Sequence, residues 1–282
     1  LFFIVIESMD ISVVIPTFNR KHTLPRAIDS VLSQSISPLE ILVIDDGSTD
    51  GTNAWIQTTY PEIKFIKQPN HGVSAARNMG IKTAKSDWIA LLDSDDEWLP
   101  DKLEKQVEML NQNPGIKFCH TEEIWVRNGV QVNQKKKHQK YGGDIFEHCL
   151  DMCRISPSSA IFHLSILDDV GYFDEGLSVC EDYDLWLRIT VKYPVLFLDE
   201  PLIKKYGGHE DQLSKVSDGI ETYRIQVLEK LIQQDFTFSQ KKTMEKMLIR
   251  KLKIYANGAQ KRGKEQVFNQ TIKRIDELSA PC

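Results

Sequence analysis

The stretch "DWIALLDSDDEW" (residues 87–98) is an apolar run that ends abruptly in acids. Asp93, Asp95, Asp96 and Glu97 fall within five positions. Because like charges this close repel one another, a helix start, open water or a bound cation must make the crowding tolerable. Which of these applies decides what this end of the strand does.

Similar apolar runs alternate with helical patterns through the first hundred residues. Strands are predicted at residues 11–16, 40–46, 63–68 and 87–93. Apolar residues recur at helical spacing between them, for example over residues 24–32. Near-continuous apolar strands separated by helices are typical of a parallel sheet covered on both faces. We therefore predict an α/β fold with a mostly parallel central sheet.

Polar segments follow three of these strands. "PTFNR" follows the first, "DDGSTD" the second and "DSDDEW" the fourth. In such sheets, ligands bind beyond the carboxyl ends of the strands. The sequence therefore predicts that carboxylates from two of these segments gather at one edge of the sheet.

Two interpretations of the first acidic cluster remain open. Asp95 or Asp96 would cap a helix beginning near Pro100, because carboxylates stabilise the first turn. Capping accounts less well for Asp93, which is still attached to the strand. In the second interpretation, Asp93 and Asp95 face one pocket and bind Mg²⁺ or Mn²⁺, which prefer oxygen ligands and also hold phosphates.

The second cluster is "VIDDGSTDGT", in which Asp45 and Asp46 precede a turn. The turn itself, with Ser48 or Thr49 capping the next helix, is one explanation. Alternatively, an aspartate here accepts hydrogen bonds from a base or ribose. Phe18 at the first strand end would stack on that base, although alone it would be assigned to the core. Together, Phe18 and Asp46 predict half of a nucleotide pocket.

The composition fits one large domain or one domain with an appendage. The chain has 282 residues, of which 41% are hydrophobic and 27% charged. A net charge of −5 argues against a nucleic-acid binder. Five cysteines without metal-binding spacing predict reduced thiols in a cytosolic protein. No run approaches the roughly 18 apolar residues that cross a bilayer.

The rest of the chain predicts a mixed region followed by helices. Asn128-Gly129 is typical of a hairpin turn. A helix that carries Cys149 and Cys153 is expected near 144–154. A helical hairpin with a break near 255–264 is expected at the end of the sequence. We expect Met9 to be the natural start. The predicted division is an extension at 1–9, a catalytic domain at 10–217 with halves 10–115 and 116–217, and a helical extension at 218–282.

Four segments together resemble glycosyltransferase family 2. They are "SVVIPTFNR", "EILVIDDGSTDGT", "NHGVSAARNMGIKTAKSDWIALLDSDDEWLPDKL" and "EDYDLWLRI", and they occur in the family's order and spacing over about residues 10–213. The resemblance implies a GT-A (Rossmann-like) fold. It also implies transfer that inverts the sugar's anomeric carbon, with a nucleoside-diphosphate sugar and a divalent metal.

The resemblance also implies roles for individual residues. Phe18 would stack on the base, Asp46 would bond the base edge, and Arg77 would lie near the diphosphate or the base. Without the family, Arg77 would be taken for a surface helix arginine. The nucleotide-binding set implied is Pro16, Phe18, Asp46, Arg77 and Asp93, with Asp93 closest to the ribose. Asp95 would meet the metal, and Asp45 and Glu181 would support the site.

The general base implied by the family match is Asp182, in "CEDYDLW". It would take the proton of the acceptor hydroxyl. The alternative is that Glu181 or Asp182 caps the helix ending near Tyr193. The resemblance also places a mobile loop at 207–214, where His209 would bond a phosphate oxygen or complete the metal shell. A solvated surface histidine is the alternative there.

The expected substrate is a nucleoside-diphosphate sugar, with UDP as first choice and GDP or dTDP open. The expected acceptor is a hydroxyl of a glycan, a lipid-linked sugar or a cell-envelope polysaccharide, and no nucleic acid. The run "KKKHQK" (135–140) is either a solvated loop or is attracted to an anionic membrane surface or phosphorylated acceptor. We therefore expect a cytoplasmic protein that can contact the inner membrane surface peripherally.

Other classes of protein remain as alternatives. A nucleotidyltransferase also uses metal-binding aspartates, but its usual early glycine-rich loop is missing from "IPTFNRKHTLPRA". A non-catalytic sugar-nucleotide-binding module would not need Asp182. A glycosidase uses paired carboxylates without a nucleotide pocket. Binding of UDP without turnover would favour the non-catalytic module.

Overall fold

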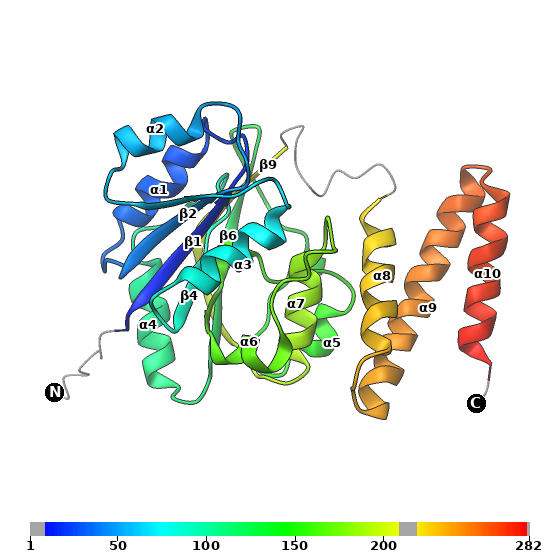
Figure 1. The fold of residues 1–282 in the computed structure, drawn as a ribbon. Helices are drawn as coiled ribbons and strands as arrows, with labels where there is room; N and C mark the ends of the chain where they lie inside the picture. The colour runs from blue at the N-terminus through cyan, green and yellow to red at the C-terminus, as the bar shows by residue number, and fades with distance from the viewer. Residues whose placement is uncertain (1–8, 209–218, 281–282) are drawn as a thin grey trace.

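The computed structural model describes residues 9–208 and 219–280. The expectations for residues 1–8, for His209 and for Cys282 lie outside these ranges. The described part has a sheet with helices on both faces, followed by three C-terminal helices (Figure 1).

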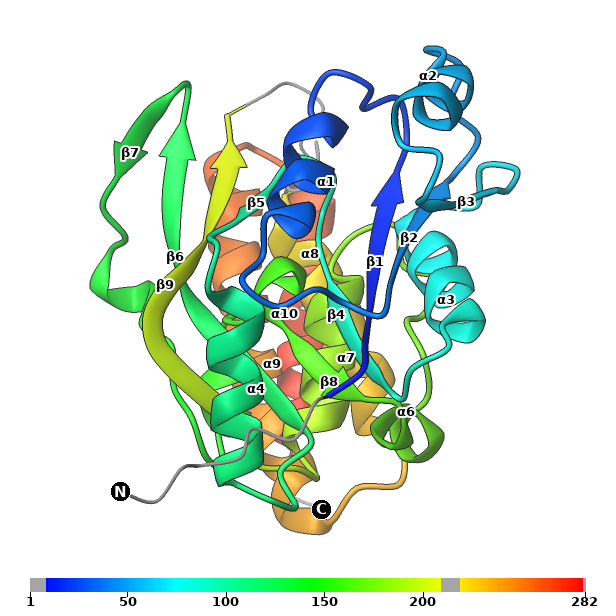
Figure 2. The ribbon, with the colours of Figure 1, turned by 90° about the vertical axis from the view of Figure 1, so that its left-hand side faces the viewer.

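The central sheet has nine strands within the described residues. Its order is β3-β2-β1-β4-β8-β6-β9-β5, with β7 paired to β6 (Figure 2). The strands are β1 (Ile11–Thr17), β2 (Glu40–Asp45), β3 (Lys64–Lys67), β4 (Trp88–Leu91), β5 (Glu97–Trp98), β6 (Phe118–Arg127), β7 (Val130–Val132), β8 (Ile161–His163) and β9 (Leu196–Gly207). The four predicted strands are confirmed as β1 to β4.

Parallel pairing is confined to two parts of the sheet. The pairs β3–β2, β2–β1 and β1–β4 are parallel, as predicted for the first half of the chain. Beyond β4, the pairs β4–β8, β8–β6, β5–β9 and β6–β7 are antiparallel, and only β6–β9 is parallel. The sheet is therefore mixed.

Both faces of the parallel half are buried. Val13 and Ile15 pack on one face with helices α1 (Leu24–Leu32) and α4 (Lys102–Gln112). Val14 packs on the other face with α3 (Val73–Thr83). A β-carbon added at Gly80 of α3 would collide with Val14, so the glycine lets this helix lie directly on β1. The first turn of α3 is thereby held at the carboxyl ends of the strands.

Four further α-helices and two 3₁₀ turns lie before residue 208 in the described part of the chain. They are α2 (Thr52–Thr59), α5 (Phe146–Cys149), α6 (Ser165–Val170), α7 (Glu181–Thr190) and the 3₁₀ turns η1 (Lys136–His138) and η2 (Pro157–Ser159). The prediction of a helix over 144–154 was too long, and Cys153 lies beyond α5. The Arg154 guanidinium donates to the carbonyl of His148, in place of a helical backbone N–H, and also to the carbonyls of Lys137 and Gln139 in the preceding segment.

The predicted hairpin turn is confirmed. Asn128 and Gly129 have φ values of 50° and 77° between β6 and β7, and a two-residue turn with positive φ at both positions matches the twist of the strands.

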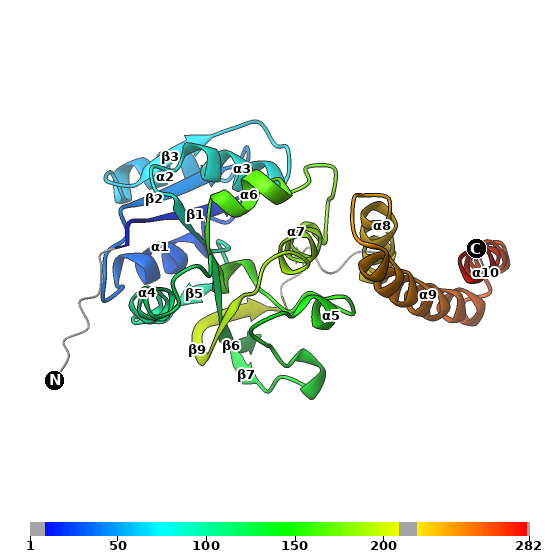
Figure 3. The same cartoon turned by 90° about the horizontal axis from the view of Figure 1, so that it is seen from below.

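The chain break predicted near 255–264 is confirmed, but the expected two-helix hairpin was wrong in its number of helices. The described residues contain three helices there: α8 (Ile220–Ile232), α9 (Phe238–Lys261) and α10 (Glu265–Ser279). Helix α9 continues through Asn257-Gly258, because Ala256 and Ala259 are buried, and the chain turns only at Gly263. Figure 3 shows α9 and α10 extending away from the sheet beyond α8. In the described residues, no helix combines the length and apolar character that a membrane span requires.

Candidate functional site

A cleft of about 1140 Å³ opens at the carboxyl ends of β1, β2 and β4. It continues between β6, β9, α7 and the start of α8. This volume slightly exceeds the usual range for small-molecule sites, so it has room for two substrates. Among the predicted site residues, the cleft is lined by Pro16, Phe18, Asp46, Arg77, Asp93, Asp95, Glu181 and Asp182.

Phe18 is on the cleft wall and not in the core. Its side chain is 45% exposed. The following residue, Asn19, has φ 52° and is tied to the loop after β2. Its N–H donates to Ser48 Oγ at 2.8 Å, and its Oδ1 accepts from Thr49 N at 2.8 Å. Ser48 therefore fixes the Phe18 loop. It does not cap α2, so that expectation was wrong.

Asp45 and Asp46 are both buried but have different surroundings. Asp45 lies off the cleft wall and accepts from Ser48 N at 3.0 Å, which stabilises the turn. Asp46 lines the cleft and accepts from Gln68 Nε2 at 2.7 Å, His71 N at 2.9 Å and Gly72 N at 2.8 Å. Three donors fix the Asp46 carboxylate and leave one of its roughly four acceptor positions for a ligand.

The acids at 93–97 do not cap helix α4. The residue at the N-cap position is Asp101, and its side chain makes no capping hydrogen bond. Asp96 is 2% exposed and accepts from Ser158 Oγ at 2.6 Å and from Tyr206 N at 3.0 Å. Burial and the neighbouring carboxylates Asp95 and Asp93 raise the pKa of Asp96 well above its usual value. The capping explanation is therefore wrong for Asp96.

Protein side chains stabilise the other acids of the cluster. Asp93 Oδ1 accepts from Arg77 Nη2 at 2.7 Å, and Asp95 Oδ2 lies 3.3 Å from Arg20 Nη1. The side chains of Asp93 and Asp95 keep 25% and 21% exposure. Arg77 and Arg20 thus offset part of the repulsion between these acids, while both carboxylates remain accessible from the cleft.

Arg77 joins the two ends of the site. Its Nη1 donates to Glu181 at 2.6 Å, at the start of α7, while Nη2 donates to Asp93 after β4. The residue is 3% exposed, so the surface arginine of the alternative interpretation is excluded. Burial alone would lower the pKa of Arg77, but Asp93 and Glu181 outweigh it and raise the pKa. The role predicted for Arg77 beside a diphosphate stays a prediction.

Asp182 lies in the first turn of α7, on the cleft wall. Its Oδ1 accepts from Tyr183 N at 2.6 Å, and its Oδ2 lies 3.3 Å from Cys153 Sγ. The expected cap by Glu181 or Asp182 is wrong, because Cys180 holds the cap position without a side-chain hydrogen bond. Cys180 has φ 63°, which is uncommon for a residue other than glycine. This turn of the backbone directs Asp182 toward the cleft.

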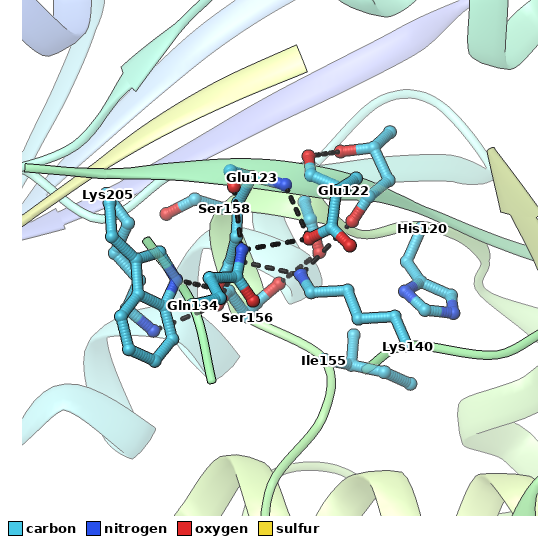
Figure 4. Close-up of polar contacts among 12 residues, drawn as sticks. His120, Glu122, Glu123, Gln134, Lys140, Ile155, Ser156, Ser158 and Lys205 are labelled. Atoms are coloured by element: carbon cyan, nitrogen blue, oxygen red, sulfur yellow. Dashed lines mark hydrogen bonds and ion pairs between the residues drawn. The ribbon is translucent and has the colours of Figure 1, made fainter. Parts of the chain in front are cut away.

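Sequence reasoning missed a buried charge network on the wall of the cleft built by β6 and β9, drawn in Figure 4. Glu123, 6% exposed, accepts from Lys140 Nζ at 2.7 Å and from Ser156 Oγ at 2.6 Å. Lys205 Nζ donates to Ser156 Oγ at 2.9 Å. Burial opposes ionisation of Glu123, but Lys140 and Lys205 lower its pKa to about 2. Lys140 itself is buried. The solvated-loop interpretation of residues 135–140 is therefore wrong at that position.

Lys205 also brings positive charge close to the acids of the cleft. Burial would lower its pKa, but Glu123, Asp96, Asp182 and Asp93 raise it. The sequence signal for this network was weak: Glu123 and Lys205 are charged residues inside strands β6 and β9.

The donor set fits a divalent cation that is shared with a substrate. In the ranges the structure describes, no group of three or more His, Cys, Asp and Glu side chains is arranged to hold a metal. Mg²⁺ commonly takes only one or two carboxylates and completes its shell with phosphates and water. Asp95 and Asp93, both accessible from the cleft, match that pattern. His209 lies outside the described residues, so its role in the metal shell stays a prediction.

The sequence profile described as glycosyl transferase family 2 matches residues 12–171. An uncharacterized glycosyltransferase of Rickettsia conorii is 34% identical over 222 residues, which are 73% of this chain and 35% of that protein. The Escherichia coli protein WfgD is 32% identical over 181 residues, 64% of this chain and 69% of WfgD. WfgD is named a UDP-Glc:α-D-GlcNAc-diphosphoundecaprenol β-1,3-glucosyltransferase. The chain spans 31% to 69% of the length of five Rickettsia relatives.

Solved structures show the same fold. Residues 1–349 of Staphylococcus aureus TarS, in complex with UDP-GlcNAc, match with a TM-score of 0.74 and 18% identity, covering 96% of this chain and 82% of that one. A mannosyltransferase from Pyrobaculum calidifontis, in complex with GDP-Man and Mn²⁺, matches with a TM-score of 0.62 and 15% identity, covering 97% and 85%. The GT-A fold predicted from the sequence is thereby confirmed.

Proposed function

This chain belongs to glycosyltransferase family 2, and we propose that it transfers a sugar from a nucleoside-diphosphate sugar to an acceptor hydroxyl with inversion at the anomeric carbon. One observation carries the proposal. An exposed aromatic ring at Phe18, the oriented carboxylate of Asp46, the acids Asp93 and Asp95, and Asp182 all line a single cleft.

On the nucleotide side, Phe18 stacks on the base, and Asp46 accepts a hydrogen bond from the base edge. Pro16 and Asp93 complete this side, with Asp93 toward the ribose. Arg77 acts here mainly by holding Asp93 in place, since both of its terminal nitrogens already donate to carboxylates. The loop from Phe18 to Arg20 is anchored to the turn after β2, which supports a preformed base site.

Asp95, with the nearby carboxylate of Asp93, would hold the divalent cation, Mn²⁺ or Mg²⁺. When bound, the cation would stabilise negative charge on the departing diphosphate. Asp182, on the opposite wall, takes the proton of the attacking hydroxyl. The Cys153 thiol, 3.3 Å from Asp182 Oδ2, holds the carboxylate toward the cleft.

For the donor we propose a UDP-sugar, and for the acceptor a hydroxyl of a lipid-linked sugar, glycan or cell-envelope polysaccharide. Both follow from the UDP-sugar named for WfgD, the diphosphoundecaprenol-linked acceptor in the same name, and the UDP-GlcNAc bound to TarS. We place nucleotide binding in residues 10–115, the acceptor side in 116–217 and a helical extension in 218–282. Such an acceptor would bring the protein to the cytoplasmic face of a membrane.

The test is calorimetry with UDP in the presence of Mn²⁺, followed by hydrolysis of a panel of nucleotide sugars. We expect UDP binding that requires the cation, and slow hydrolysis of one donor. Binding without any turnover, with or without sugar acceptors, would instead identify a non-catalytic sugar-nucleotide-binding module. Absence of nucleotide binding would refute the proposal.

A further inference from the structure

One face of helix α9 is basic and exposed. Lys242, Lys246, Arg250, Lys253 and Lys261 are all exposed. They are separated by four, four, three and eight positions, so they lie along one side of the helix. We refer to these five residues as the α9 basic face.

The opposite side of α9 is packed. Its buried residues include Met244, Leu248, Lys251, Leu252, Ala256 and Ala259. Met244, Leu248 and Leu252 belong to one apolar cluster with residues of α8 and α10, such as Leu228 and Ile275. No side chain of the α9 basic face forms an ion pair with another described residue. The positive charge on this face is therefore not neutralised within the described part of the protein.

The α9 basic face contrasts with the charge of the rest of the chain. Residues 238–264 contain nine basic residues and one acidic residue, a net charge of +8. Since the whole chain carries −5, the remainder carries −13. A molecule with this distribution is attracted to an anionic surface through α9 and repelled elsewhere, so contact with that surface would orient it.

We propose that the α9 basic face docks on an anionic lipid surface. Four of its five cations are lysines, which act as point charges and do not need the planar partners that arginine selects. Two large apolar side chains border the face: Phe238 is 81% exposed and Ile254 is 53% exposed. Lys242 Nζ lies 5.6 Å from the centre of the Phe238 ring. Basic helices with exposed apolar residues at their border are suited to the interface of a membrane.

A second basic segment follows β7. Figure 3 shows β7, with the chain that follows it, and α9 along the lower side of that view. The chain after β7 contains the exposed residues Lys135, Lys136 and Lys137. Lys137 and His138 also line the cleft, so a lipid surface that touches both basic segments lies at the rim of the cleft. The proposed docking does not rest on the proposed reaction. The inference that a lipid-linked acceptor reaches the cleft from that surface does rest on it.

Co-sedimentation of the full chain with lipid vesicles tests the docking. We expect binding to vesicles of equal parts phosphatidylglycerol and phosphatidylcholine, no binding to phosphatidylcholine alone, and loss of binding at high salt. In the triple variant Lys242→Gln, Lys246→Gln, Lys253→Gln, partitioning should fall by about a hundredfold, since each cation near such a surface contributes about fivefold.

The matched control removes the same charge from the other side of the molecule. Lys67, Lys82 and Lys85 are exposed, and in Figure 3 the elements β3 and α3 that carry or precede them lie away from α9. The triple glutamine variant at these positions should partition like the parent protein. Equal losses in the two triple variants would overturn the proposal, as would equal binding to neutral and anionic vesicles.

Two further measurements separate other occupants of this face. If the α9 variant changes the molecular mass measured by light scattering, the face is an interface between copies and the lipid assignment is wrong. Tighter binding to duplex DNA than to anionic vesicles, with the same dependence on α9, would also overturn it. Hydrolysis of a soluble nucleotide sugar should be unchanged in both triple variants. A failure of docking is thereby distinguished from a failure of the proposed reaction.

Discussion

The two halves of the cleft use acidic residues in different ways. In the half built on β1, β2 and β4, Asp93 and Asp95 stand at a strand end, each beside one arginine, and stay partly exposed. In the half built on β6 and β9, Glu123 is buried within a strand and is enclosed by Lys140, Ser156 and Lys205. Acids of the first kind can receive a ligand, whereas the second kind stabilises the wall beside Asp182.

The largest expected effect is on the rate of sugar transfer, when Asp182, the proposed base, is replaced. Asp182→Asn removes the proton acceptor and should lower the rate of sugar transfer by about 10²- to 10⁴-fold. UDP affinity should stay within about twofold, since the nucleotide side is untouched. Initial rates with the preferred donor, together with calorimetry, measure both. The control Asp235→Asn changes an exposed acid remote from the cleft, and a similar loss there would contradict the assignment.

Glu123→Gln should affect stability more than any single change in the other half. It leaves Lys140 and Lys205 buried without their main counter-charge, at a cost of about 3–5 kcal/mol in the free energy of unfolding. Denaturant unfolding at neutral pH measures this. Glu147→Gln, on the exposed surface of α5, should cost less than about 0.5 kcal/mol. Equal losses of stability in the two variants would show that Glu123 does not stabilise this half of the cleft through its buried network.

The same network predicts a dependence of stability on pH. The pKa of Glu123 is lowered to about 2 from an ordinary value of 4.5. A lowered carboxyl pKa stabilises the folded state above pH 4.5, and that stability is lost as the pH falls toward 2. The loss is about 3 kcal/mol. Across this window, the free energy of unfolding should fall more steeply with decreasing pH for the parent protein than for Glu123→Gln. The same dependence on pH in both proteins would contradict the prediction.

In the first half, Asp95→Asn should act through the metal. Turnover with Mn²⁺ should fall by about 100-fold, and the Mn²⁺ concentration for half-maximal activity should rise. Asp101→Asn, just beyond the acidic stretch and exposed, serves as the matched control. Chelation with EDTA should abolish turnover, and added Mn²⁺ should restore it. Activity that ignores both treatments would show that the accessible acids do not hold a cation.

The smallest effect is expected at the aromatic end. Phe18→Ala should weaken UDP binding by about tenfold through lost stacking, and Phe18→Trp should retain it. The free energy of unfolding should change little, because Phe18 is 45% exposed. Leu39→Ala, with 48% exposure away from the cleft, is the control. An unchanged UDP affinity in Phe18→Ala would remove this residue from the site.

Much of the first half was predictable because its signals are local. Apolar runs predicted β1 to β4, and the rule for parallel sheets predicted that the acids after β2 and β4 meet at one edge. What sequence reasoning did not predict was the partners of those acids. Asp96 accepts a hydrogen bond from Tyr206, 110 positions away, and that contact depends on the pairing of β5 with β9.

The second half was less predictable because its contacts cross several elements. Glu123 meets Lys140 only because β6 and the chain after β7 fold back on each other, and Lys140 belongs to a run that resembles a solvated loop. The end of helix α9 was located only to within residues 255–264 for a similar reason. Asn257-Gly258 disfavours a helix locally, but the burial of Ala256 and Ala259 against neighbouring helices outweighs that preference.

The bridge made by Arg77 has a consequence for protein engineering. One guanidinium group spaces the strand end that carries Asp93 from the helix that carries Glu181 and Asp182. A chimaera that joins the first half of this enzyme to the second half of a relative would have to preserve a carboxylate at position 181. Otherwise each half would fold by itself, but Asp182 would no longer be aligned with Asp93 and Asp95 across the cleft.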